Sequence, residues 1–293
     1  MSLFTFYFLE FTAIYIILAW AIYLPFRINQ VYFGSIYSMC VGAYFSGYIS
    51  REFGWPFWLA LAGAAVLCVL ISLIFAHKLA SLAGFPMMLA STAFVFIIQA
   101  VIRNLGFLGG STGLYGIPFV PQYSLLVLTY GIIVITGFFI YRLESSHLGR
   151  AMDAIRSDPT VASSLGIDIK KVSVQLQIMA SALGGISGGL YAFTFCNISL
   201  EAFGFSLITF TVSIVIVGGM NTMWGILITA PLLWSISQFV PDALKNYSNI
   251  IYAALLIIVL ILRPAGLIDR KMLKGIHTFF GFVMRRSFIL INR

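Results

Sequence analysis

Charged side chains gather in one segment of this chain, residues 142–173. The segment holds five of the 17 Lys and Arg residues and four of the 9 Asp and Glu residues, and apolar stretches of membrane-spanning length flank it on both sides. Dense, mixed charge of this kind can form ion pairs and hydrogen bonds with a second protein. Composition alone leaves two alternatives open: a docking segment for a second protein and an ordinary solvated loop between two spans.

The middle of this segment has residues that begin and end a short helix. Asp158 is a preferred N-cap, and Pro159 suits the first helical position, where its missing N–H is not needed. Gly166 tolerates the left-handed conformation that often ends a helix. We expect a helix over Pro159–Leu165, about 10 Å long at 1.5 Å per residue.

The predicted helix carries two apolar side chains, Val161 and Leu165, among small ones. Upstream, Leu148, Met152 and Ile155 recur at i, i+4 and i+7, which is the apolar stripe of an amphipathic segment. A plain linker needs no capped helix. These features therefore favour docking, with the two apolar side chains entering a groove on another protein.

Polar residues at membrane depth could line a solute path, because lipid does not tolerate unpaired polar groups. The first candidates are Gln99, Arg103, Asn104, Ser111 and Thr112. Gln99 and Arg103 are four residues apart and share one helix face, and the arginine could attract a carboxylate. The alternative for Arg103 is a side chain that snorkels to the outer lipid headgroups.

A second candidate group for the path lies between two predicted spans and comprises Gly218, Gly219, Asn221 and Thr222. It suits a gate or a re-entrant turn. A plain tight turn is the alternative, since Asn and Gly supply the backbone conformations that turns require.

The sequence offers no constellation for catalysis or for metal binding. Neither G-x-x-x-x-G-K-[ST] nor H-E-x-x-H occurs, so an ATP-binding P-loop and this type of zinc site are absent. The cysteines and histidines show no metal-binding or disulfide spacing; they are Cys40, Cys68, Cys196, His77, His147 and His277. Glu10 falls within a predicted span or near its outer end. We predict that the chain is not an enzyme and holds no metal.

Composition sets the fold class. Hydrophobic residues make up 61% of the chain and charged residues 9%, whereas soluble domains carry about 25% charged residues. The apolar runs are long and do not alternate at period two, which favours helices over a barrel. We predict an all-α, polytopic helical membrane protein with about nine spans (eight to ten), at 3–24, 31–49, 57–76, 87–105, 122–141, 173–194, 204–218, 223–240 and 248–262.

Two of these spans are weak. The second is rich in Gly and Ser, which indicates either close helix packing or a break in the helix. The seventh is shorter than the ~20 residues that a crossing helix needs. Residues 1–24 lack a basic start, so we expect a retained first span rather than a signal peptide.

Basic residues are unevenly distributed between the two predicted sides. Placing 142–173 in the cytoplasm puts fourteen of the 17 Lys and Arg residues inside and leaves Arg51, Arg103 and Lys245 outside. The positive-inside rule then predicts an N-out, C-in topology. We expect a transmembrane domain over 1–268 and a basic cytoplasmic tail over 269–293. The net charge of +8 suits a face against anionic lipid, so no nucleic-acid partner is expected.

The segment GRAMDAIRSDPTVASSLGIDIKKVSV resembles the cytoplasmic coupling segment of permeases of branched-chain amino acid ABC importers, the leucine/isoleucine/valine type. The family motif reads approximately G-R-A-x-x-A-I-R-x-x-x-x-A-A-x-x-L-G-I, and Ser163 replaces the second Ala of its central pair. The resemblance implies an ATPase-coupling role for Gly149, Arg150, Asp153, Ala154, Arg156, Asp158, Pro159, Val161, Ala162, Leu165 and Gly166.

Further segments resemble the family in the expected order, over roughly residues 27–268. They are GGSTGLYGIP at 109–118, SALGGISGGLYA at 181–192, IVIVGGMNTMWG at 214–225 and RPAGLI at 263–268. One stretch differs: where the family has Gly-Gln-x-Ser-x-Gly-His, this chain has RINQVYFG at 27–34, without a histidine. Members of the group also move urea and short amides, so the difference leaves the substrate open.

The resemblance implies a transport subunit for branched-chain or related hydrophobic amino acids in the bacterial cytoplasmic membrane. Its partners would be a sister permease, two ATP-binding subunits and an extracytoplasmic substrate-binding protein. ATP and Mg²⁺ would bind to the partner subunits, and no cofactor is expected in this chain. The alternatives are a permease for urea or short amides and a self-contained channel or secondary carrier.

Overall fold

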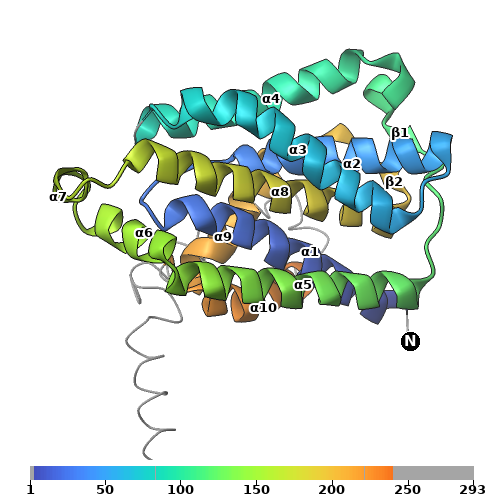
Figure 1. Ribbon diagram of the computed structural model, residues 1–293. Coiled ribbons are helices and arrows are strands. Elements are labelled where there is room, and N and C mark those ends of the chain that lie inside the picture. The colour runs from blue at the N-terminus through green and yellow to red at the C-terminus, as the bar shows by residue number, and fades with distance from the viewer. Residues whose placement is uncertain (1–2, 83, 221, 240–293) are drawn as a thin grey trace, which may run out of the picture.

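The computed structural model describes residues 3–82, 84–220 and 222–239, which form a bundle of long helices (Figure 1). The elements are α1 Leu3–Phe26, α2 Gly34–Phe53, α3 Phe57–Leu79, α4 Phe85–Asn104, η1 Gly106–Leu108, η2 Gly110–Thr112, β1 Leu114–Tyr115, α5 Gln122–Ser145, α6 His147–Ser157, α7 Pro159–Ser164, α8 Ile169–Phe195, β2 Asn197–Ile198, η3 Leu200–Phe203, α9 Phe205–Gly218 and α10 Met223–Phe239. The prediction of an all-helical membrane fold is confirmed, apart from the two-residue strands.

Eight of the nine predicted spans coincide with helices, namely α1 to α5 and α8 to α10. The ninth, 248–262, lies outside the described residues. Within the described part of the chain, six segments are long and apolar enough to cross a membrane. The short seventh span is one of them, because η3 and Gly204 precede the 14 residues of α9 and extend the segment to 19 residues, Leu200–Gly218.

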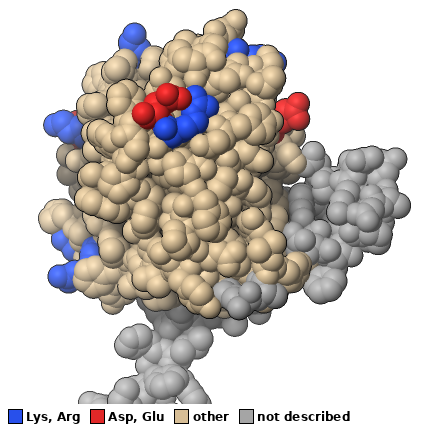
Figure 2. Space-filling model, turned by 90° about the vertical axis from the view of Figure 1, so that its right-hand side faces the viewer, with Lys and Arg blue, Asp and Glu red and all other residues tan. Residues whose placement is uncertain are grey.

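The helices run back and forth between two ends of the bundle (Figure 1). α6 and α7 lie at one end, while β1, β2 and the beginning of α1 lie at the other. β1 and β2 pair antiparallel, with Leu114 opposite Ile198 and Tyr115 opposite Asn197. Seen from the end with the strands, the surface is mostly uncharged, with a few separate charged groups (Figure 2). The docking segment and the 109–118 segment therefore lie at opposite ends, as the predicted topology requires.

The interface between α2 and α8 shows why the second span is rich in small residues. A Cβ on Gly188 would lie 1.9 Å from the carbonyl oxygen of Met39, and one on Gly42 would lie 2.3 Å from that of Gly185. α2 is one continuous helix. Of the two alternatives for this span, close packing of helices at small residues is therefore the one observed.

Candidate docking and coupling site

The first turn of α7 is capped as the sequence predicts. Oδ1 of Asp158 accepts hydrogen bonds from the backbone N–H groups of Thr160 at 2.7 Å and Val161 at 3.2 Å. Pro159 is the first helical residue. The hydrogen bonds from the Val161 and Thr160 amides hold the pKa of the Asp158 carboxyl below its ordinary value.

The end of α7 forms a compact glycine turn. Gly166 has φ +82°, its N–H donates to Ser163 O at 3.0 Å, and the N–H of Ile167 donates to Ala162 O at 3.1 Å. This is the paired hydrogen bonding of a Schellman motif. Leu165 follows the last helical residue instead of being part of the helix, a difference of one residue from the predicted end.

The apolar side chains of α7 face outward. Val161 is 55% exposed and Leu165 is 74% exposed, and residues four apart lie on the same side of a helical segment. Ala162 is the one buried residue of α7 and turns toward the protein. α7 and the residue that follows it therefore present two apolar side chains at one end of the bundle, which is the arrangement that a docking helix needs.

α6 attaches α7 to the bundle. Met152 and Ile155 are buried and Leu148 is half-buried, so the predicted apolar stripe is confirmed. Gly149 packs so closely against the end of α5 that a Cβ there would lie 2.0 Å from Glu144 O. Arg150 is exposed, whereas Ala154 is half-buried.

Two predicted coupling residues of α6 point into this chain. Asp153 Oδ1 lies 2.6 Å from Nη2 of Arg27, which is buried at the end of α1. Arg156 Nη1 donates to the carbonyl oxygens of Phe26 at 3.4 Å and Met220 at 3.2 Å. From the sequence, Arg27 is expected only as one of the basic residues on the cytoplasmic side. The acidic residues of 142–173 were the available signal that this arginine has partners.

The first candidate path group lies at the end of the bundle that carries the strands. Gln99 Nε2 donates to Phe203 O at 2.8 Å, which ties α4 to η3. Arg103 is exposed, which agrees both with a path residue and with a snorkelling one. Asn104 Nδ2 bonds within α4, to Ala100 O at 2.8 Å. The exposed residues Ser111 and Thr112 belong to η2.

The second candidate path group forms the turn between α9 and α10, at the end that carries α6. Gly219 has φ +110°, and a Cβ on Gly225 would lie 1.7 Å from Gly218 O. The backbones of α9 and α10 are thus in close contact beside this segment. Thr222 is buried, and Asn221 lies outside the described residues. The two groups are at opposite ends of the bundle, so they do not form one site.

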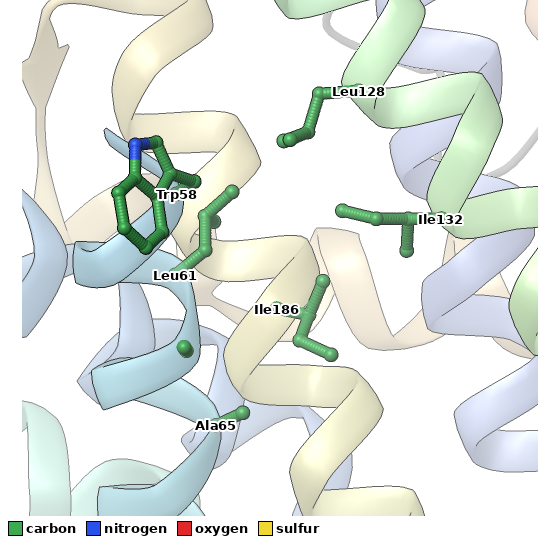
Figure 3. A pocket seen from close by; sticks show the side chains of 7 residues that line it. Trp58, Leu61, Ala65, Leu128, Ile132 and Ile186 are labelled. Carbon is green, nitrogen blue, oxygen red and sulfur yellow. The ribbon is translucent and has the colours of Figure 1, made fainter. Parts of the chain in front are cut away.

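A cavity of about 170 Å³ lies between α3, α5 and α8 (Figure 3). Its lining is predominantly apolar: Trp58, Leu61, Ala62, Ala65, Leu128, Ile132 and Ile186. It contains no residue of either path group, and among the lining side chains only the indole N–H of Trp58 is a hydrogen-bond donor. Among the described residues, no group of three or more His, Cys, Asp or Glu is placed to hold a metal ion.

Comparison with known proteins shows which family this chain matches. Residues 4–260 match the family described as branched-chain amino acid transport system / permease component. The chain is 24% identical over 268 residues to the high-affinity branched-chain amino acid transport system permease protein LivM of Escherichia coli (strain K12), which covers 80% of this chain and 62% of that protein. It is 27% identical over 184 residues to the probable branched-chain amino acid transport permease protein LivH of Methanocaldococcus jannaschii, which covers 59% of this chain and 55% of that protein.

The aligned region thus spans less than two thirds of the length of each of these relatives. No solved structure matches the chain significantly.

Proposed function

Because the chain belongs to the permease family of branched-chain amino acid transport systems, we propose that it is a membrane-spanning subunit of an ATP-driven ABC importer. In this role it forms part of the translocation path for branched-chain or related hydrophobic amino acids. The chain is a multi-pass protein of the bacterial cytoplasmic membrane and a transport subunit rather than an enzyme. The family resemblance that the 142–173 segment suggested is thereby confirmed.

The observation that carries the ATP-driven mechanism is α7. This short helix is capped at both ends, and Val161 and the adjacent Leu165 are exposed. A separate ATPase could therefore bind it as a rigid element. The sequence contains no P-loop, so ATP and Mg²⁺ would bind in two partner subunits docked at this end of the bundle. A sister permease would complete the path, and an extracytoplasmic binding protein would deliver the amino acid at the end that carries β1 and β2.

Reconstitution in vesicles tests this function. The chain alone should move no L-leucine, and the chain assembled with its sister permease, ATPase and binding protein should take up L-leucine only when ATP is supplied. Uptake through the isolated chain, driven by the solute gradient, would instead support a channel or carrier. Urea or acetamide uptake by the complete assembly, without leucine uptake, would support the alternative of an amide permease, which the difference at 27–34 leaves open.

A further inference from the structure

A buried arginine joins three helices at the end of the bundle that carries α7. Arg27 is 1% exposed, and its guanidinium faces two carboxylates: Asp153 on α6, with Nη2 to Oδ1 at 2.6 Å, and Glu144 on α5, with Nε to Oε1 at 3.8 Å. Tyr23, one turn earlier on α1, donates its hydroxyl proton to the same Glu144 oxygen. Burial of a charge is unfavourable unless it is paired. This arrangement therefore requires α6 to stay against the end of α1.

A second arginine fastens α6 to a different part of the membrane domain. Arg156, three residues after Asp153, donates from Nη1 to Phe26 O and to Met220 O. Its own carbonyl oxygen accepts from Asn29 Nδ2 at 3.3 Å. Met220 belongs to the turn between α9 and α10, next to Gly219. α6 is thus bonded both to the end of α1 and to the turn that contains the second candidate path group.

The contacts form a continuous route from α7 to the membrane helices. α7 packs against α6, Asp153 connects α6 to α1, and Arg156 connects α6 to the α9–α10 turn. Building on the proposed function, we propose that Arg27 and Arg156 are positioning residues that transmit movement of the ATPase-docked α6 and α7 to α1 and to the α9–α10 turn. They touch neither ATP nor the transported amino acid. Their role is to couple ATP hydrolysis to solute transport.

The chemistry of the guanidinium explains why arginine occupies both positions. Its planar group presents several N–H donors in fixed directions, and its charge does not depend on pH in proteins. Arg27 faces two carboxylates at once, and Arg156 spans two carbonyl oxygens. A lysine ammonium is a compact point charge with flexible donors. It would keep the charge while holding α6 less firmly in orientation.

The test uses the complete transporter in vesicles and measures ATP hydrolysis and L-leucine uptake in the same sample. Arg156→Gln should retain the ATPase and its hydrolysis within about twofold, while uptake per ATP falls roughly 5- to 150-fold, the range typical of coupling between sites. The uptake per ATP of Arg156→Lys should lie between that of Arg156→Gln and that of the wild type. Lys78→Gln, which removes the same charge at an exposed lysine near the end of α3 and outside residues 142–173, is the control and should leave uptake per ATP unchanged.

The buried pair is tested by exchange of its charges. Arg27→Asp and Asp153→Arg should each lower uptake per ATP, and the double variant should regain a substantial part because the pair is restored with opposite polarity. If Arg27→Asp does not yield folded protein, the Arg156 variants alone test the proposal. A purely structural role would lower the melting temperature and the amount of assembled complex in parallel with uptake, with no change in uptake per ATP in what remains.

Two outcomes overturn the proposal. If Arg156→Gln transports as much L-leucine per ATP as wild type, or loses uptake only in proportion to assembled complex, the arginines do not transmit movement, although the proposed function stands. If the wild-type chain binds no ATPase, the proposed function fails and this inference fails with it.

Discussion

Thr129 on α5 donates a hydrogen bond from Oγ1 to Oε2 of Glu10 on α1, at 3.0 Å and across 119 residues of sequence. Glu10 is completely buried, and its Oε1 has no hydrogen-bond partner among the described residues. The same hydroxyl also lies 2.9 Å from Leu125 O, and its single proton can serve only one acceptor at a time. Glu10 is therefore an under-satisfied carboxyl within the helix bundle.

Removal of the Thr129 hydroxyl should destabilise the bundle. Thr129→Val leaves the Glu10 carboxyl without this donor, and an unsatisfied buried polar group costs about 1–3 kcal/mol. Thr129→Ser keeps the donor and should melt close to wild type. In the Glu10→Gln background, which removes the ionisable group, Thr129→Val should cost less. Thermal unfolding in detergent measures all of these, and a Thr129→Val protein that melts at the wild-type temperature would contradict the assignment.

Gly188 should tolerate no side chain. A Cβ there would lie 1.9 Å from Met39 O and 2.8 Å from Ala43 N, both of them backbone atoms that cannot rotate away, so Gly188→Ala must push α2 and α8 apart. Overpacking of this kind costs about 1–3 kcal/mol. Gly131→Ala is the matched control, because nothing lies within 4 Å of its Cβ and alanine favours the helix. Melting temperatures should fall for the first variant and hold or rise for the second.

Leu165→Asp tests the docking surface. The side chain is exposed, so folding and membrane insertion should survive. A carboxylate buried in the groove of a partner without a counter-ion is costly, so co-purification of the ATPase should weaken and ATP-dependent uptake should fall. Ser145→Asp adds the same charge to an exposed site at the end of α5 and should be nearly silent. Wild-type ATPase binding by Leu165→Asp would return 142–173 to the solvated-loop alternative.

The N-cap of α7 should be sensitive to substitution and to acid. Asp158→Ala removes the acceptor for two backbone N–H groups and should speed hydrogen exchange of the α7 amides, whereas Asp158→Asn keeps an acceptor. The folded-state pKa of this carboxyl is lowered, so its stabilising effect is complete above the ordinary pKa and is lost as the pH falls through the lowered value. The difference in exchange between wild type and Asp158→Ala should therefore disappear only in strong acid.

Cysteine labelling checks the predicted orientation. With the three native cysteines replaced by Ser, Tyr115→Cys and Thr160→Cys place single thiols at exposed positions at opposite ends of the bundle. In intact cells, a membrane-impermeant maleimide should label position 115 and leave position 160 unmodified. After the membrane is made permeable, both should react. Labelling of position 160 from outside would reverse the topology and remove the docking proposal.

Local sequence signals were sufficient for the helices and for α7. Long apolar runs locate the spans because lipid requires each backbone to satisfy its own hydrogen bonds. Asp158, Pro159 and Gly166 act on neighbouring residues, so the short helix and its ends could be predicted without knowledge of the fold. The apolar stripe through Met152 and Ile155 likewise depends only on helical periodicity.

Other relationships depend on residues brought together from distant parts of the chain. The spacing of residues along the chain does not reveal that Arg27 pairs with Asp153, that Gln99 reaches Phe203, or that β1 meets β2. The sequence could show that the second span has small residues but not whether they mark a break or a close contact. Those outcomes depend on which helices pack side by side. The energetic effect of a buried charge or of a glycine at a helix interface is set by the atoms that lie opposite it.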